Sequence, residues 1–136
     1  MLLTLWGSTG CAEAPTDPWY YANQFYQDAI TYNVDASSVK FVFEDKLIHS
    51  SGKRAAGICS CGTNIITIDR KIWSRYIERQ RRELIYHEMG HCALRIVCKW
   101  TEPPHPSNGL IMAPSLSNIK DDNWDSAVST LFKERR

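Results

Sequence analysis

The stretch His87-Glu88-Met89-Gly90-His91 reads H-E-x-x-H, and the rest of the chain is best interpreted around it. On a helix, residues four positions apart share a face, so His87 and His91 are expected to point at one metal ion. Neutral imidazole suits zinc, and these two side chains supply half of a tetrahedral shell. Glu88 follows the first histidine and is placed to accept a proton from water at the metal. The motif therefore predicts a Zn²⁺ site with one ion per chain.

The residues around the motif predict a long helix. No proline lies between Ile72 and Trp100, and we expect the helix to enter from Ile72 and to run to about Lys99. Gly90 costs about 1 kcal/mol inside a helix, which makes sense if another segment packs closely against the helix below the metal. The alternative is a surface helix that carries two histidines and a salt-bridging glutamate.

Length and composition predict a single globular domain. The chain has 136 residues, is 43% hydrophobic and contains five Trp and six Tyr, which is enough for a real core. Its formal net charge is +1. The densest basic run, residues 70–82, is interpreted as a solvated helix face. We therefore expect no nucleic-acid partner, and no transmembrane span is visible.

The first eleven residues resemble the end of a bacterial lipoprotein signal, in which small residues precede a cysteine that becomes lipidated. They depart from that pattern: no Lys or Arg comes first, the apolar run is short, and Ser8 replaces an aliphatic residue. We expect residues 1–18 to form a signal-like segment and tether, with a possible lipid anchor at Cys11. Residues 19–136 would form the domain. A frayed N-terminus is the alternative.

Removing Cys11 from the five cysteines leaves an even number, namely Cys59, Cys61, Cys92 and Cys98. In an oxidising compartment these could form two disulfides, with the connectivity left open. Cys59 and Cys61 could instead form a metal or redox pair, although zinc sites usually space their cysteines more widely. A buried free thiol is a further alternative for each. The cysteines favour the bacterial cell envelope or periplasm; a phage-encoded chain that is not exported would be cytoplasmic.

Local signals predict the other elements. Asp17 and Pro18 suit the cap and first position of a helix that ends near Asn33. A last helix is expected to begin at Asp121 or Asp122. The predicted strands are residues 39–43, 57–61 and 64–68. The predicted buried faces are Trp19, Ala22, Tyr26, Ala29 and Ile30 in the first helix, and Trp124, Val128, Leu131 and Phe132 in the last.

The H-E-x-x-H motif followed by Ile111-Met112-Ala113-Pro114 resembles the zincin metallopeptidases, and within them the metzincin clan. That clan places a turn bearing a methionine beneath the metal, and Met112 matches that methionine. The resemblance implies an α+β fold in which a small twisted mixed sheet packs on an N-terminal helix and an active-site helix. A C-terminal helix would close the lower side.

The resemblance also implies a function, which is zinc-dependent hydrolysis of peptide bonds by a metalloendopeptidase with Glu88 as general base. The substrate would be a protein or peptide, and the chain would be a monomer. Residues 64–68 resemble the edge strand on which such enzymes lay an extended substrate. We therefore expect Asn64, Ile65, Ile66 and Thr67 to bind substrate.

The third zinc ligand departs from the clan, whose longer motif has glycine and histidine where this chain has Leu94 and Val97. The helix therefore need not break early, and the ligand must come from elsewhere. His105 is the expected third ligand, because it lies just ahead of Met112, and His49 is interpreted as a solvated loop residue. The competing carboxylates are Glu102, Asp121, Asp122 and Asp125.

Two other functions remain open from the sequence. One is a non-catalytic zinc-binding or interaction module of the same fold in a bacterial envelope or phage. The other is a structural protein in which the motif is incidental. A structural metal site gains nothing from an unliganded carboxylate beside the ion, so Glu88 favours the enzyme.

Overall fold

The computed structural model describes residues 15–98 and 110–133, which form a small mixed α+β fold. This agrees with the sequence-based expectation at the level of fold class. No helix in the described part of the chain is long and apolar enough to cross a membrane. The elements, in chain order, are α1 (Pro18–Thr31), β1 (Lys40–Glu44), β2 (Gly57–Ser60), β3 (Ile65–Asp69), α2 (Arg70–Arg75), α3 (Glu78–Cys92) and α4 (Asp121–Lys133).

The sheet has the strand order β1-β3-β2, with β1 parallel and β2 antiparallel to β3. The prediction that residues 64–68 form the edge strand is therefore wrong. Ile65, Ile66 and Thr67 lie in the central strand, where their backbone pairs with neighbours on both sides, and Asn64 precedes it. Ile66 and Ile68 have no exposed surface, as expected for the most enclosed strand.

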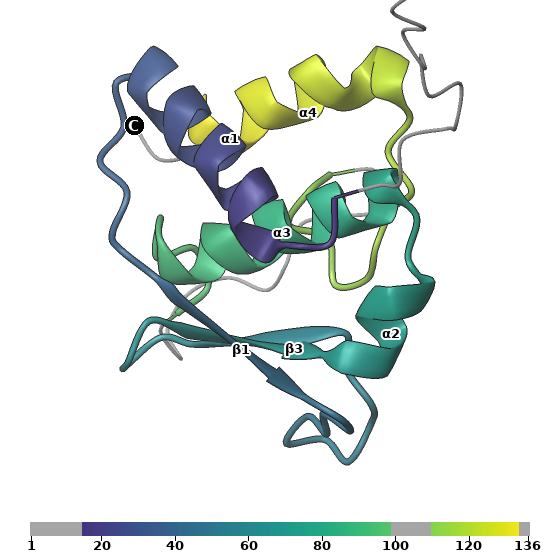
Figure 1. The fold of residues 1–136 in the computed structure, drawn as a ribbon. Coiled ribbons are helices and arrows are strands. Elements are labelled where there is room, and N and C mark those ends of the chain that lie inside the picture. The colour runs from purple at the N-terminus through teal and green to yellow at the C-terminus, as the bar shows by residue number, and fades with distance from the viewer. Residues whose placement is uncertain (1–14, 99–109, 134–136) are drawn as a thin grey trace, which may run out of the picture.

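Helix α3 lies between the sheet and the pair α1 and α4 (Figure 1). Aromatic side chains join the three helices. The ring of Phe25 in α1 lies 5.2 Å from Tyr86 in α3 and 5.1 Å from Phe132 in α4. Tyr86 also lies 4.8 Å from Trp124. These ring contacts fasten α3 to both α1 and α4.

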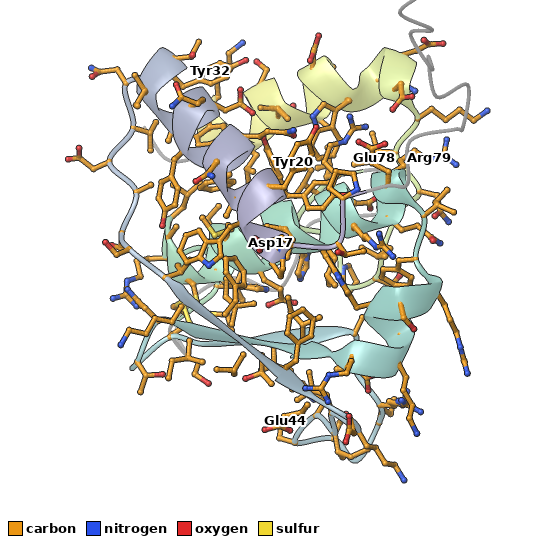
Figure 2. The ribbon with its side chains drawn as sticks, in the orientation of Figure 1. Asp17, Tyr20, Tyr32, Glu44, Glu78 and Arg79 are labelled. Carbon is orange, nitrogen blue, oxygen red and sulfur yellow. A yellow bond between two sulfur atoms is a disulfide. The ribbon has the colours of Figure 1, made fainter. Side chains whose placement is uncertain are left out.

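Helix α1 begins and ends as predicted, but its buried face differs. Asp17 lies at the start of α1 (Figure 2). Its carboxylate accepts the Trp19 N–H at 2.9 Å, and Asn33 takes a φ of 54° just past the end of the helix. Trp19 is 40% and Ile30 71% exposed, so neither belongs to the core. The buried residues are Pro18, Tyr21, Ala22, Phe25 and Ala29. The predicted face of α4 is buried as expected.

The single long helix predicted from residue 72 onward is two helices. Tyr76 and Ile77 are extended, with ψ values of 138° and 166°, and they separate α2 from α3. The Gln80 side chain accepts the Ile77 N–H at 3.0 Å, which caps the start of α3. The absence of proline therefore did not imply a continuous helix. The Tyr76 backbone N–H closes α2 by donating to the Ile72 and Trp73 carbonyls, and the Gln80 side chain caps the start of α3.

Asp69 joins the end of β3 to two other segments. Its fully buried carboxylate accepts the N–H groups of Ile72 and Leu47, both at 3.0 Å, and the Arg54 Nε–H at 2.9 Å. The hydrogen bond from Arg54, helped by the backbone donors and opposed by burial, holds the pKa of Asp69 well below its usual range. Asp69 therefore fixes the loop before β2 against the start of α2.

Replacing Asp69 with alanine is expected to lower the free energy of unfolding at pH 7 by about 2–4 kcal/mol, because buried donors lose a charged acceptor. A folded-state pKa below the unfolded value of 3.8 stabilises the fold above that pH, and this contribution is lost as pH falls through the folded pKa. The difference between wild type and variant should therefore shrink in acid. Denaturant titrations at pH 7 and pH 3 measure it.

Asp45→Ala is the matched control, since the Asp45 side chain is 74% exposed and pairs with Arg70 at the surface. It should cost no more than about 0.5 kcal/mol. Equal losses in the two variants at pH 7 would contradict the role given to Asp69.

Candidate metal centre

Helix α3 brings the two motif histidines together. The Nε2 atoms of His87 and His91 lie 3.2 Å apart. The Nδ1 of His87 lies 2.8 Å from the Ile111 carbonyl, and the Nδ1 of His91 lies 2.7 Å from the Ile96 carbonyl. Because a carbonyl only accepts, each Nδ1 donates in these bonds, which leaves Nε2 as the nitrogen that can bind a metal when the ring is neutral.

This geometry fits a tetrahedral metal ion. Two nitrogen ligands at 2.0–2.1 Å from zinc lie about 3.3 Å apart, close to the separation of the two Nε2 atoms. Backbone carbonyls that receive the other ring proton fix both the tautomer and the orientation of metal-binding histidines. His87 and His91 therefore have the separation, tautomer and outer hydrogen bonds that a zinc site requires.

The turn that carries Met112 supports His87 from below. The Ala113 N–H donates to the Leu110 carbonyl at 3.1 Å, and Met112 is almost fully buried. A Cβ atom added to Gly90 would lie only 2.3 Å from the Met112 sulfur. This confirms the expectation that another segment packs closely against Gly90. The turn thus packs under the helix while its Ile111 carbonyl orients His87.

Glu83 anchors the segment after this turn to α3. It lies one helical turn before His87 and is 1% exposed. Its carboxylate accepts the N–H groups of Ser117 and Ile119, the latter at 3.0 Å. One helix therefore holds both histidines and the chain that returns from the Met112 turn.

Helix α3 ends at Cys92, directly after the second histidine. The expectations that the helix continues to about Lys99 and need not break early are therefore wrong. Past the end, the Ile96 N–H donates to the Gly90 carbonyl at 3.0 Å, which turns the chain back along the helix. This reversal is what brings the Ile96 carbonyl to His91.

The reversal uses left-handed backbone conformations at non-glycine residues. Arg95 has a φ of 63° and Val97 a φ of 54°. For a β-branched residue such as Val97 this conformation is strained by about 1–3 kcal/mol. Strain of this kind persists where surrounding contacts determine the backbone, and here it flanks the carbonyl that orients His91.

Two disulfides tie this reversal to the sheet. Cys59 in β2 pairs with Cys92, and Cys61 pairs with Cys98. The sequence allowed two bridges of open connectivity beside a metal pair or free thiols, and the structure contains two bridges with this pairing. The Cys98 sulfur also lies 2.9 Å from the His91 carbonyl oxygen. The end of α3 is therefore fastened to β2 and the turn after it, next to His91.

The three motif residues line a cleft of about 570 Å³. Glu88 lies in the cleft wall and is only 5% exposed, so its access to water is limited. The strand that lines the cleft is β2, through Gly57, Ile58 and Cys59, and not β3. A Cβ atom added to Gly57 would lie 3.1 Å from Glu88 Cγ. Sequence reasoning missed Gly57, whose lack of a side chain lets β2 approach the glutamate.

Other groups complete the cleft wall. Tyr76 faces it, and burial, reinforced by the charges of Glu83 and Asp69, raises the pKa of the phenol, so the hydroxyl remains a proton donor at neutral pH. His49 also lines the cleft, on a loop where its Nδ1 accepts the Ser51 N–H at 3.1 Å. His49 is exposed, which agrees with the sequence-based interpretation.

The third ligand is not found in the described ranges 15–98 and 110–133, where no His, Cys, Asp or Glu joins His87 and His91 in a group that could hold an ion. Asp121 instead accepts from Arg82 at 2.8 Å, and Asp125 lines a separate hollow beside Asp28. Asp122 is exposed and does not line the cleft. His105 and Glu102 lie outside the described residues.

Comparison with known protein families, with curated proteins and with solved structures gives no significant match. The function is therefore argued from the site itself.

Proposed function

We propose that this chain is a zincin-like zinc metallopeptidase that hydrolyses peptide bonds, with one zinc ion held by His87 and His91. The observation that supports it most is the 3.2 Å separation of the two Nε2 atoms, with both Nδ1 atoms bonded to backbone carbonyls. The Met112 turn packed against Gly90 adds support, because the resemblance to the metzincin clan includes such a methionine-bearing turn below the metal.

Zinc at this site would polarise the scissile carbonyl and lower the pKa of an attacking water. Glu88 accepts the proton of that water and passes it to the leaving amine. Its confinement between α3 and Gly57 holds the carboxylate in position for both transfers. His105 is proposed as the third ligand, which leaves one position open for catalysis.

The proposed substrate is an extended protein or peptide segment that pairs with β2. Among the described strands, β2 pairs only with β3, so one of its backbone edges is available, and its residues line the cleft. Strand addition uses backbone donors and acceptors and tolerates many sequences. This proposal replaces the substrate-binding role that the sequence suggested for residues 64–67.

The paired cysteines support an oxidising compartment such as the bacterial periplasm. Cys11, the possible lipid anchor, lies outside the described residues. An envelope location, with or without a lipid, is therefore part of the proposal.

Metal analysis tests the proposal. Protein purified without chelator is expected to contain about one zinc per chain, and the variant with His87→Ala and His91→Ala should contain almost none. His49→Ala is the matched control, since His49 lines the same cleft yet bonds within its own loop. If the double variant holds as much zinc as wild type, the metal centre is wrong and the peptidase proposal fails with it.

Gly57→Ala is expected to reduce peptidase activity about 10- to 100-fold, because a displaced catalytic group of this kind costs roughly that much. The added Cβ would lie 3.1 Å from Glu88 Cγ and 3.3 Å from Leu84 Cδ1. Zinc content should not change. Gly62→Ala is the control, since nothing lies within 4 Å of its added Cβ. Equal rates in the two variants would show that Gly57 does not position Glu88.

A further inference from the structure

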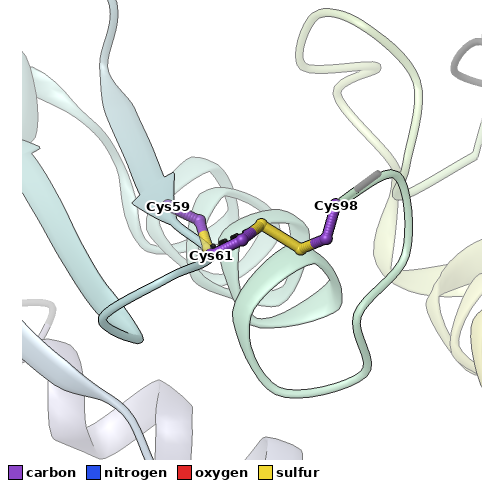
Figure 3. A group of neighbouring side chains, drawn as sticks. All are labelled: Cys59, Cys61 and Cys98. Carbon is purple, nitrogen blue, oxygen red and sulfur yellow. Dashed lines mark hydrogen bonds between the residues drawn. A yellow bond between two sulfur atoms is a disulfide. The ribbon is translucent and has the colours of Figure 1, made fainter. Parts of the chain in front are cut away.

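A second group of metal-ligating side chains lies outside the histidine centre. The sulfur atoms of Cys59, Cys61 and Cys98 all lie within 4.8 Å of one another (Figure 3). Cys92 is bonded to Cys59, so its sulfur adjoins the same group. These cysteines come from β2, the turn after it, the last residue of α3 and the segment beyond.

The spacing of these atoms suits a metal ion as well as disulfides. Cys59 and Cys61 are not bonded to each other, yet their sulfurs lie 3.7 Å apart. Two thiolates at 2.3 Å from tetrahedral zinc lie about 3.8 Å apart. Thiolates also select soft ions such as zinc over calcium or magnesium. The fold therefore holds two sulfurs at the separation that a shared zinc ion requires, before any rearrangement.

We propose that reduction of both disulfides converts Cys59, Cys61, Cys92 and Cys98 into a tetrathiolate zinc site, distinct from the site of His87 and His91. Each disulfide takes two electrons and two protons from a small dithiol, which is oxidised to its own disulfide, and yields two thiols. Zinc then replaces the four thiol protons, which pass to solvent. Electrons and protons balance with two dithiols per chain.

Contacts independent of the sulfur bonds keep these segments together. β2 is paired with β3 over residues Gly57 to Ser60. The segment after α3 is held by the hydrogen bond from Ile96 to Gly90 and by Arg95, whose guanidinium donates to the Cys61 carbonyl. The positive charge of Arg95 lies beside the turn and would offset part of the negative charge of a zinc tetrathiolate.

The consequence concerns the histidine centre. In the disulfide form, β2 and the reversal after α3 are fastened together, and these two segments carry Gly57 and the Ile96 carbonyl. A zinc ion on the same four sulfurs would keep that fastening in a reducing compartment. The chain would then retain its cleft wall in an oxidising compartment and in a reducing one.

The test uses the full chain with Cys11→Ser, His87→Ala and His91→Ala, so that the four cysteines are the remaining thiols and the paired histidines are removed. This background also separates the outcome from that of the proposed peptidase. The protein is reduced with a phosphine, which takes its oxygen from water to become phosphine oxide while the two protons of that water go to the thiols, and is titrated with Co²⁺. We expect an intense thiolate-to-cobalt absorption band that saturates at one ion per chain, and no such band in the oxidised protein.

Two comparisons make the result specific. Cys61→Ser should weaken cobalt binding at least about 100-fold, while Ser60→Ala, its exposed neighbour, should not. Binding should also weaken at least 100-fold in strong urea, because the folded chain gathers the ligands. If reduction unfolds the protein, added zinc should restore its far-ultraviolet circular dichroism. Absence of the band, equal affinity in urea, or an unfolded chain that zinc does not refold would each overturn the proposal.

Discussion

Glu88→Gln is expected to slow the cleavage of an unfolded protein such as casein by about 100- to 10,000-fold, the usual contribution of a general base. Glutamine keeps the shape of the side chain but cannot accept a proton. Glu88 lines the cleft and is 5% exposed. The carbonyls that orient His87 and His91 belong to Ile111 and Ile96, and the substitution leaves them unchanged, so zinc content should stay at the wild-type level. Parallel rate and metal measurements check both parts.

Glu78→Gln is the matched control, because it makes the same chemical change in the first turn of the same helix. It should cleave at the wild-type rate. Glu88 is not the base if its variant also does so. A wild-type protein that holds zinc but cleaves no unfolded protein would favour the non-catalytic module instead.

Local chemistry explains why many elements could be predicted from the sequence. Asp17 and Pro18 start a helix by a cap and a fixed φ, which depend on neighbours within a few residues. Alternation of Val39, Phe41 and Phe43 with their neighbours marks β1, and a short run of β-branched residues at 65–68 marks β3. The strand order could not be predicted, because β3 acquires partners from two different segments, and periodicity does not identify which strand lies between the others.

The end of α3 is another feature that local sequence patterns could not predict. No helix-breaking residue lies between His91 and Cys98, and the helix stops there nonetheless. Backbone hydrogen bonds and two disulfides, which join residues 33 and 37 positions apart, determine the reversal. Long-range bonds of this kind leave no pattern in the neighbouring sequence.

The candidate site also contains parts that the sequence predicts and parts that it does not. The proximity of His87 and His91 could be predicted, with Glu88 beside them, because residues four positions apart on a helix share one face. The groups that orient them could not, because the Ile96 and Ile111 contributions are backbone carbonyls, which any residue provides. Gly90 lies between these cases: its helix cost predicted a close contact, and the structure identifies Met112 as the partner.

The third ligand is expected to be His105, and His105→Ala should weaken zinc binding at least about 100-fold, more than loss of an outer-shell group does. Both ends of the segment that contains it are anchored at the metal centre: Cys98 lies against the His91 carbonyl, and the Ile111 carbonyl accepts from His87. A ligand from this segment therefore needs only a short return to the ion.

The carboxylates at the start of α4 are the comparison for this prediction. Asp121 is bonded to Arg82, and Asp125 lines a hollow formed with Asp28 and Trp124, away from the cleft of the histidines. Asp121→Ala and Asp125→Ala should therefore bind zinc with wild-type affinity in a competition titration against a chromophoric chelator. If Asp125→Ala loses zinc while His105→Ala keeps it, the ligands are two histidines and a carboxylate. In that case α4 must approach the cleft when zinc binds, and the turn bearing Met112 would be a packing feature without the ligand arrangement of the metzincin clan.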